Sequence, residues 1–125
     1  MPLGIMIEVP SAAILIESLL PHVDFVSLGT NDLTQYLLAA DRDDPKMSSY
    51  YRATHPAVFA TIRHVVADAD RMKKPVSICG ELAGDPRYVS LLIGLGLRSL
   101  SVAPEQLQRV RTAIRETTEV RAANL

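Results

Sequence analysis

The chain has 125 residues, of which 48% are hydrophobic and 22% are charged, and its formal net charge is −1. This balance is typical of a single folded domain with one core, and it excludes a disordered chain and a basic nucleic-acid-binding protein. The longest apolar runs, such as residues 12–16 and 91–97, are much shorter than the ~20 residues of a membrane-spanning helix.

Apolar runs of strand length alternate with segments of helical periodicity along the chain. In order, the sequence predicts a strand over residues 5–9, a helix over 10–20, a strand over 24–28, a helix over 31–40, a polar link over 41–54, a helix over 55–74, a strand over 75–80, a helix over 85–96, a strand over 100–102 and a helix from Pro104 onward. The buried stripe of the fourth helix is expected to consist of Tyr88, Leu91, Leu92 and Leu95.

Four strand-plus-helix units predict a parallel α/β sheet. Two architectures fit: part of an open, doubly wound sheet, and half of a (β/α)8 TIM-type barrel. A barrel needs about 250 residues for eight units, so four units in this chain match its size. The sequence has no glycine-rich phosphate loop of the Rossmann or Walker type, which disfavours a nucleotide-binding open sheet. Because the chain opens abruptly in an apolar strand, we expect it to be a fragment of a larger protein.

Glu8 stands out because a carboxylate in an apolar strand is costly to bury without a partner. A cation shared with Asp32 is one possible partner, since two carboxylates suit Mg²⁺ when phosphate oxygens and waters complete its octahedron. An arginine or lysine of a neighbouring strand is the alternative.

Asn31 and Asp32 follow the second strand at the start of a helix, where free N–H groups favour phosphate or carboxylate ligands. The alternative is an ordinary turn in which Asn31 caps the helix. Arg42, in the following loop, suits a phosphate because its planar fork is always charged. Otherwise it pairs with a loop aspartate: Asp41, Asp43 or Asp44.

Cys79 is the only cysteine, so no internal disulfide is possible and a reducing, cytoplasmic location is expected. It lies at the end of the third strand beside a glycine-containing turn, which favours reactivity over the usual role of a small hydrophobe. Glu81 is a candidate helix-start cap or supporting acid. The three histidines show no metal spacing; we expect His55 to cap a helix or lie in a loop, and His22 and His64 to lie at the surface or between helices.

Four ordered motifs resemble the phosphoenolpyruvate (PEP)-utilising enzyme family. They are Gly-Ile-Met-Ile-Glu-Val-Pro at residues 4–10, the run from Asp24 to Tyr36 that contains Asn-Asp-Leu-Thr-Gln, Ala-Asp-Arg at residues 40–42, and Cys-Gly-Glu-Leu-Ala-Gly at residues 79–84. The last motif is most similar to the Enzyme I type, the PEP–protein phosphotransferases of bacterial sugar transport.

The resemblance implies the C-terminal half of a (β/α)8 barrel that binds PEP and Mg²⁺. By motif position, Glu8 and Asp32 are implied as metal ligands, Asn31 and Arg42 as phosphate-binding residues, and Cys79 as the acid that protonates the enolate carbon. This agrees with the need to neutralise a transferring phosphoryl group.

The implied activity is transfer of the phosphoryl group of PEP to a protein histidine. The implied partners are an N-terminal histidine domain and a small phosphocarrier protein, and none of His22, His55 and His64 lies in the motif of the histidine domain. The alternatives are a fragment of pyruvate phosphate dikinase or PEP synthase, or a non-catalytic oligomerisation or regulatory module. Because a half-barrel leaves two strand edges and its inner face open, we expect a homodimer.

Overall fold

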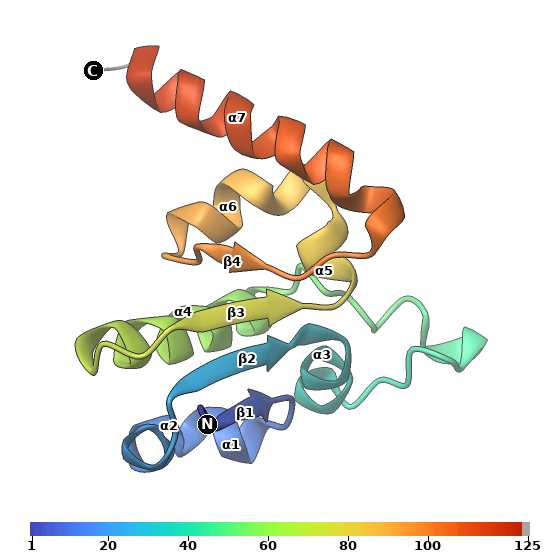
Figure 1. The fold of residues 1–125 in the computed structure, drawn as a ribbon. Coiled ribbons are helices and arrows are strands. Elements are labelled where there is room, and N and C mark those ends of the chain that lie inside the picture. The colour runs from blue at the N-terminus through green and yellow to red at the C-terminus, as the bar shows by residue number, and fades with distance from the viewer. Residues whose placement is uncertain (124–125) are drawn as a thin grey trace.

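The computed structural model describes the backbone of residues 1–123 and the side chains of residues 1–118. Within these residues the chain forms one parallel sheet of four strands: β1 (Gly4–Ile7), β2 (Phe25–Gly29), β3 (Val76–Cys79) and β4 (Ser99–Leu100). The strands lie side by side in the order of the sequence, β1-β2-β3-β4 (Figure 1).

Helices connect the strands and continue past the last one. The α-helices are α1 (Pro10–Ile14), α2 (Ile16–Leu19), α3 (Thr30–Leu38), α4 (Pro56–Arg71), α5 (Glu81–Gly84), α6 (Val89–Gly94) and α7 (Leu107–Ala123). Short 3₁₀ turns are η1 (Leu20–His22), η2 (Pro45–Met47), η3 (Pro86–Tyr88) and η4 (Pro104–Gln106). Over residues 1–123, no helix combines the length and the apolar character needed to cross a membrane.

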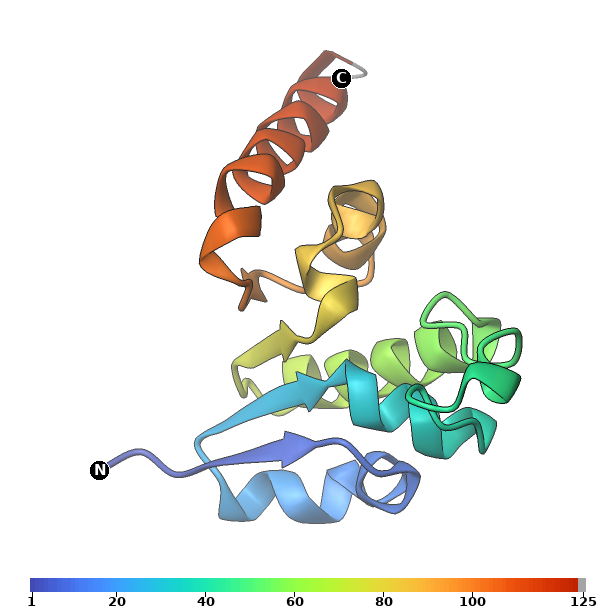
Figure 2. The same cartoon turned by 90° about the vertical axis from the view of Figure 1, so that its right-hand side faces the viewer.

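The strand order separates the two architectures that the sequence left open. In a doubly wound sheet the strand order reverses at a switch point and helices cover both faces. Here the order never reverses, and α4 lies behind the sheet in Figure 1. Figure 2 shows that no helix of residues 1–123 covers the opposite face of the strands. This is the arrangement of half a (β/α)8 barrel, whose helices all lie outside the strands.

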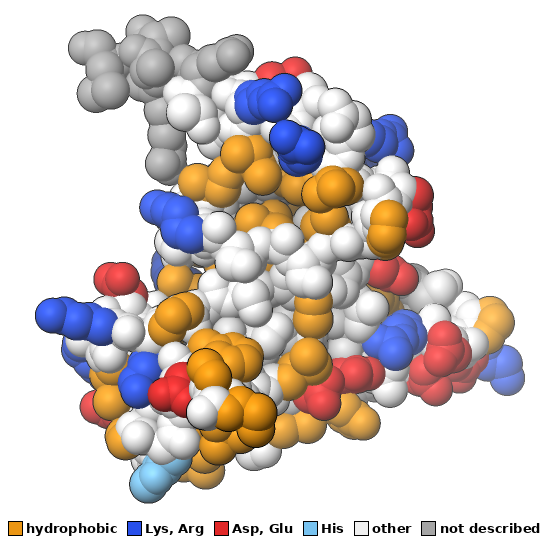
Figure 3. All heavy atoms as spheres, in the orientation of Figure 1, with side chains coloured by type: hydrophobic (Ala, Val, Ile, Leu, Met, Phe, Trp, Pro, Cys, Tyr) orange, Lys and Arg blue, Asp and Glu red, His pale blue; other side chains and the backbone are white. Residues whose placement is uncertain are grey.

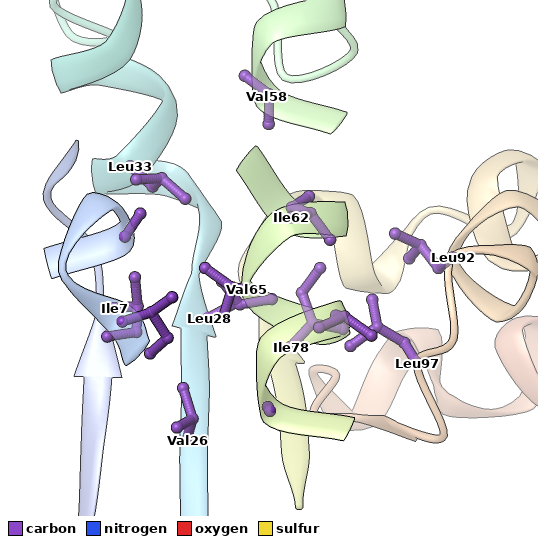
Figure 4. Packing of buried hydrophobic residues seen from close by; sticks show 14 of the residues in the cluster. Ile7, Val26, Leu28, Leu33, Val58, Ile62, Val65, Ile78, Leu92 and Leu97 are labelled. Atoms are coloured by element: carbon purple, nitrogen blue, oxygen red, sulfur yellow. The ribbon is translucent and has the colours of Figure 1, made fainter. Parts of the chain in front are cut away.

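The core lies between the sheet and the helices, as Figure 4 shows. Its fully buried side chains come from alternate strand positions, from one face of α4, and from α3, α6 and the turn after α6. Those labelled in the figure are Ile7, Val26, Leu28, Leu33, Val58, Ile62, Val65, Ile78, Leu92 and Leu97. Full burial of one such side chain stabilises the fold by roughly 1.5–3 kcal/mol.

The long helix agrees best with its prediction. Proline occupies its first position, and His55 is the residue before it; the His55 Nδ1 accepts a hydrogen bond from the Ala57 N–H at 3.1 Å. The expectation that His55 caps a helix is therefore confirmed. The helix ends at Arg71, so the predicted extension to residue 74 is wrong; Lys73 has a positive φ of 57°, which is incompatible with helix.

Two predicted helices differ from the structure. The predicted helix over residues 10–20 is interrupted at Leu15, where φ is −92° and ψ is 14°. The predicted helix over residues 85–96 begins instead as the 3₁₀ turn η3, so α6 starts only at Val89. Because the α-helix starts only at Val89, a different set of side chains faces the core: Val89 and Leu92 are completely buried, whereas Leu91 is 43% exposed. The prediction that Leu91 belongs to the buried stripe is therefore wrong.

The fourth strand is shorter than predicted. It ends at Leu100, although the Ser101 N–H still donates to the Ile78 carbonyl at 2.8 Å. The chain then turns into η4 at Pro104, which has no N–H to continue the ladder.

Candidate active site

The sheet register aligns four residues at the carboxyl ends of the strands. Ile7 pairs with Leu28, Leu28 with Ile78, and Ile78 with Leu100. Since successive strand residues face opposite sides, the residues one step further along point toward the uncovered inner face. They are Glu8, Gly29, Cys79 and Ser101.

Glu8 lies over Gly29 of the neighbouring strand. A Cβ added at Gly29 would lie 3.2 Å from Glu8 Oε2 and 3.0 Å from Met6 Sδ. The glycine therefore leaves the space that the Glu8 carboxylate occupies. Among the described side chains, no arginine or lysine forms an ion pair with Glu8, so the alternative of pairing with a neighbouring strand is not realised there.

Asn31 does not cap its own helix. Gly29 is the capping residue of α3, without a side-chain cap, and Asn31 Oδ1 accepts a hydrogen bond from the Glu81 N–H at 3.0 Å. The alternative interpretation of Asn31 as a cap is therefore wrong. Because a backbone donor occupies the amide oxygen, the Asn31 NH₂ group is the part of the side chain that can donate to an anion.

Arg42 pairs with Asp32 across the start of α3. Its Nη1 lies 3.3 Å from Asp32 Oδ1, and the two side chains are 34% and 43% exposed. The Arg42 N–H also donates to Gln35 Oε1 at 3.4 Å. The loop aspartates have other roles: Asp41 and Asp44 accept from nearby backbone N–H groups, each at 2.9 Å. Pairing of Arg42 with a loop aspartate is thus not what the structure shows.

Tyr51 is a site residue that the sequence did not reveal. Its hydroxyl donates to the Asn31 carbonyl at 3.3 Å. Burial raises the pKa of Tyr51 above its usual value of 10.0, the negative charge of Glu81 raises it further, and Arg42 opposes both effects. The phenol therefore lies among residues from three segments of the site. It comes from an aperiodic loop, which gave no signal for this role.

Cys79 opens into a cleft of ≈ 940 Å³ between β3–α5 and η4–α7. Residues that line it include Asn31, Cys79, Glu81, Arg87, Ser101 and Arg109. The thiol donates to the Leu28 carbonyl at 3.4 Å. Of the residues predicted to form a site, Asn31 and Cys79 share this cleft, whereas Glu8, Asp32 and Arg42 do not line it.

The side chains that the structure describes, those of residues 1–118, include no group of three or more histidine, cysteine or acidic residues that could hold a metal ion. A closed, all-protein site is therefore absent from the described residues. Glu8 directly follows β1, and Asp32 lies in the first turn of α3, after the adjacent strand β2. These two carboxylates still fit Mg²⁺, because this ion is usually bound by one or two carboxylates together with substrate phosphates and waters.

Comparison with known families identifies the chain. The family described as "PEP-utilising enzyme, PEP-binding domain" matches residues 1–119. The chain belongs to the PEP-utilising enzymes. This result agrees with the four sequence motifs and with the fold.

Curated relatives bear several names. The chain is 48% identical over 112 residues to a probable PEP synthase of Pyrococcus abyssi, covering 89% of the chain and 14% of the relative. It is 47% identical over 115 residues to a multiphosphoryl transfer protein of Xanthomonas campestris, covering 92% of the chain and 14% of that relative. It is 46% identical over 114 residues to a PEP–protein phosphotransferase of Cupriavidus necator, covering 91% and 20%. The chain thus spans a fifth or less of these relatives, and the identities do not separate synthase from phosphotransferase.

Solved structures support the fold. An HpcH/HpaI aldolase from Desulfitobacterium hafniense superimposes with a TM-score of 0.60 at 23% identity, covering 93% of this chain and 42% of the aldolase. A citrate lyase from Burkholderia xenovorans gives 0.65 at 20% identity, covering 90% and 38%. At such low identity the likeness concerns the fold alone. The chain corresponds to part of a larger α/β chain in each case.

Proposed function

We propose that this chain is the C-terminal half of the barrel of an Enzyme I-type PEP–protein phosphotransferase, a cytoplasmic enzyme. The observation that carries the proposal is the placement of Glu8, the Asn31–Asp32 turn and Cys79 at the carboxyl ends of three neighbouring strands. Barrel enzymes of this kind build their active sites at that edge.

The proposed phosphate contacts come from Asn31 and Arg42. The Asn31 amide oxygen is held by the Glu81 N–H, so its NH₂ group is available to a phosphate oxygen. Arg42 is paired with Asp32 through a half-exposed contact, and such exposed pairs contribute little free energy. A phosphate dianion is therefore able to replace Asp32 as the ion-pair partner of Arg42. The Asp32 carboxylate is then available to bind a cation.

Glu8 and Asp32 are the residues proposed to hold Mg²⁺. When bound, the ion would neutralise charge on the transferring phosphoryl group. The protein's own contribution is to present one carboxylate from the end of β1 and the other from the first turn of α3, with Gly29 leaving room for Glu8.

Cys79 is the proposed acid. When the phosphoryl group leaves PEP for a histidine of the acceptor domain, the remaining enolate takes a proton on its methylene carbon. In this step the S–H bond of Cys79 breaks, a C–H bond forms, and the resulting thiolate regains a proton from water. Protonation on carbon converts the enolate into the more stable keto form of pyruvate, which favours forward transfer.

The proposed partners are an N-terminal histidine domain and a small phosphocarrier protein. Relatives named multiphosphoryl transfer protein support them, since the chain covers only 14% of such proteins. A second candidate, PEP synthase, is supported by the 47–48% identity to Pyrococcus proteins of that name. The two candidates differ in their products, because a synthase forms PEP whereas the phosphotransferase consumes it.

The test replaces both proposed metal ligands, Glu8→Gln with Asp32→Asn, in the full-length protein that carries this chain. We expect PEP-dependent phosphorylation of a protein histidine to fall by about 10²-fold or more, as for other losses of charge stabilisation at a transition state. The matched control is Glu17→Gln with Asp70→Asn, which alters the same residue types on α2 and α4.

Each outcome separates the candidates. Unchanged histidine phosphorylation in the double variant would leave only a non-catalytic module. Net formation of PEP, without transfer from PEP to a protein histidine, would favour the synthase. The 125-residue chain alone is expected to release no pyruvate from PEP and Mg²⁺, because the histidine domain is a separate part of the proposed enzyme.

A further inference from the structure

Two consecutive residues of α3 hold the turn that follows β3. The Thr30 hydroxyl donates to the Cys79 carbonyl at 2.7 Å, and the Glu81 N–H donates to Asn31 Oδ1 at 3.0 Å. These bonds fix the peptide groups on both sides of Gly80. We call this pair of hydrogen bonds the Thr30–Asn31 latch.

Gly80 allows the latch to close. Its φ is +96°, and a Cβ at this position would lie 2.5 Å from Thr30 Oγ1 and 2.8 Å from Asn31 Oδ1. Both the backbone conformation and the close approach therefore require glycine. Glycine also makes this turn intrinsically free to rotate, so the two hydrogen bonds carry the restraint.

Thr30 is 1% exposed, and its hydroxyl has a specific partner. Since Oγ1 donates to a backbone carbonyl, replacing Thr30 by valine would leave that carbonyl without this donor while keeping the side-chain shape. The Cys79 thiol is bonded to β2, the strand that directly precedes Thr30, because Sγ donates to the Leu28 carbonyl at 3.4 Å. Cys79 is thus held at its side chain and at its main chain by the β2–α3 segment.

We propose that Thr30 is the positioning residue that orients the Cys79 thiol toward the substrate. This inference rests on the proposed function, in which Cys79 is the acid. The same helical turn presents Asn31 to the phosphate and fixes the strand end that carries Cys79. The distance between the phosphate site and the proton donor is therefore set by one short, rigid segment.

The first test measures the alkylation rate of Cys79 by iodoacetamide in the 125-residue chain. Thr30→Val is expected to react about fivefold faster than the unchanged chain, which is the effect of losing one ordinary hydrogen bond from the closed state. Thr30→Ser keeps the hydroxyl and is expected to restore the original rate. The matched control is Thr61→Val, which removes a similar hydroxyl-to-carbonyl bond, to Ala57 at 2.8 Å within α4, and should leave Cys79 unaffected.

Circular dichroism checks that each variant is folded. If Thr30→Val does not fold, Thr30→Ala against Thr30→Ser gives the same comparison without added bulk. In the unchanged chain, hydrogen exchange at the Glu81 amide supplies a measurement that needs no variant: the latch predicts slow exchange there. Equal alkylation rates in Thr30→Val and the unchanged chain, or exchange of the Glu81 amide at the unprotected rate, would overturn the proposal.

A kinetic readout distinguishes positioning from a general structural role. In the full-length protein, Thr30→Val is expected to lower kcat about tenfold with little change in KM for PEP, and Thr30→Ser is expected to recover kcat. A rise in KM alone would contradict positioning of the acid. If PEP fails to protect Cys79 from alkylation while Thr30→Val still accelerates it, the latch stands and the proposed function is wrong.

Discussion

At the scale of single residues, Tyr51 connects the Arg42 loop to the helix that carries Asn31. Its hydroxyl reaches the Asn31 carbonyl and also lies near Thr34, close enough for that hydroxyl to lower the Tyr51 pKa. The Thr34 oxygen is fully buried and has no partner in full hydrogen-bond geometry among the described residues. The Tyr51 hydroxyl is the polar group next to the Thr34 hydroxyl. Removal of the Tyr51 hydroxyl would therefore leave the Thr34 hydroxyl in a more apolar environment.

We predict that Tyr51→Phe lowers the free energy of unfolding by about 0.5–1.5 kcal/mol at pH 7, the usual net value of one hydrogen bond. The control Tyr50→Phe lies next to it in the same loop and is 66% exposed, so its effect should stay within about 0.5 kcal/mol. Urea unfolding measures both. Equal stability of the two variants would contradict the contact.

The pH dependence of this difference follows from the raised pKa of Tyr51. A group whose pKa is raised in the folded state loses its stabilising contribution as the pH rises above its unfolded value, here 10.0. The unchanged chain therefore loses stability above pH 10, whereas the phenylalanine variant has no phenol there to ionise. Above pH 10, the difference in the free energy of unfolding between the unchanged chain and Tyr51→Phe should therefore become smaller.

The sequence could place Glu8, Asp32 and Cys79 at or just after the ends of three successive strands, and therefore near one edge of the sheet, because the carboxyl ends of parallel strands meet at one edge. Their proposed roles in catalysis remain predictions. The sequence could not predict that Asn31 binds the Glu81 N–H, since the two residues are 50 positions apart and a local cap explained Asn31 equally well. Tyr51 was missed for the same reason, because its partners lie in other segments.

At the scale of elements, strands and α4 were predictable because burial imposes a regular period on them. The short helices were not. In α6 a 3₁₀ turn precedes the helix and shifts its buried face by one position or more, and no periodicity rule anticipates such a shift. Asp85 begins that turn: it accepts from the Arg87 N–H at 3.0 Å and pairs with Arg87 Nη2 at 2.6 Å.

Asp85→Ala should therefore destabilise the chain by about 0.5–2 kcal/mol at pH 7, the usual effect of losing a side-chain cap. Hydrogen bonding from Arg87 is the main cause that holds the pKa of Asp85 below its ordinary value of 3.8. A depressed carboxyl pKa gives stability that is lost as the pH falls through the folded value. The difference in the free energy of unfolding between Asp85→Ala and the unchanged chain should thus become smaller below pH 3.8.

Urea unfolding at pH 7 and pH 3 measures this difference. Asp43→Ala serves as the control, since among the described residues the Asp43 side chain accepts no hydrogen bond and should give a small effect at both pH values. If Asp85→Ala lost more stability relative to the unchanged chain at pH 3 than at pH 7, the pKa of Asp85 would not be lowered by folding, and the prediction would be wrong.

At the scale of the whole molecule, the sheet has two unpaired edges and one uncovered face. β1 and β4 each pair on one side only within the described residues. Met6 and Phe25 are 49% and 41% exposed, and Figure 3 shows apolar side chains gathered on the face that is turned toward the viewer. Open edges and exposed apolar surface both favour association.

We predict that the 125-residue chain forms a two-fold homodimer, in which four strands from each copy complete an eight-stranded ring. Light scattering across a dilution series should give twice the monomer mass of 13.7 kDa. Phe25→Glu should yield monomers, while the control Leu91→Glu, at a site of similar exposure (43%) on α6, should not. A mass of 13.7 kDa at every concentration would rule the dimer out.

The sequential strand order also has a consequence for synthesis on the ribosome. Each strand pairs only with strands next to it in the sequence, so β1, β2 and α3 can form before β3 has been made. The hydrogen bond between Asn31 and Glu81 spans 50 residues, whose synthesis takes about 3–10 s at ordinary translation rates of 5–20 residues per second. During that interval the nascent chain already carries Glu8, Asn31 and Asp32 but not Cys79, so the residues proposed to bind the metal and the phosphate are made before the residue proposed as the acid.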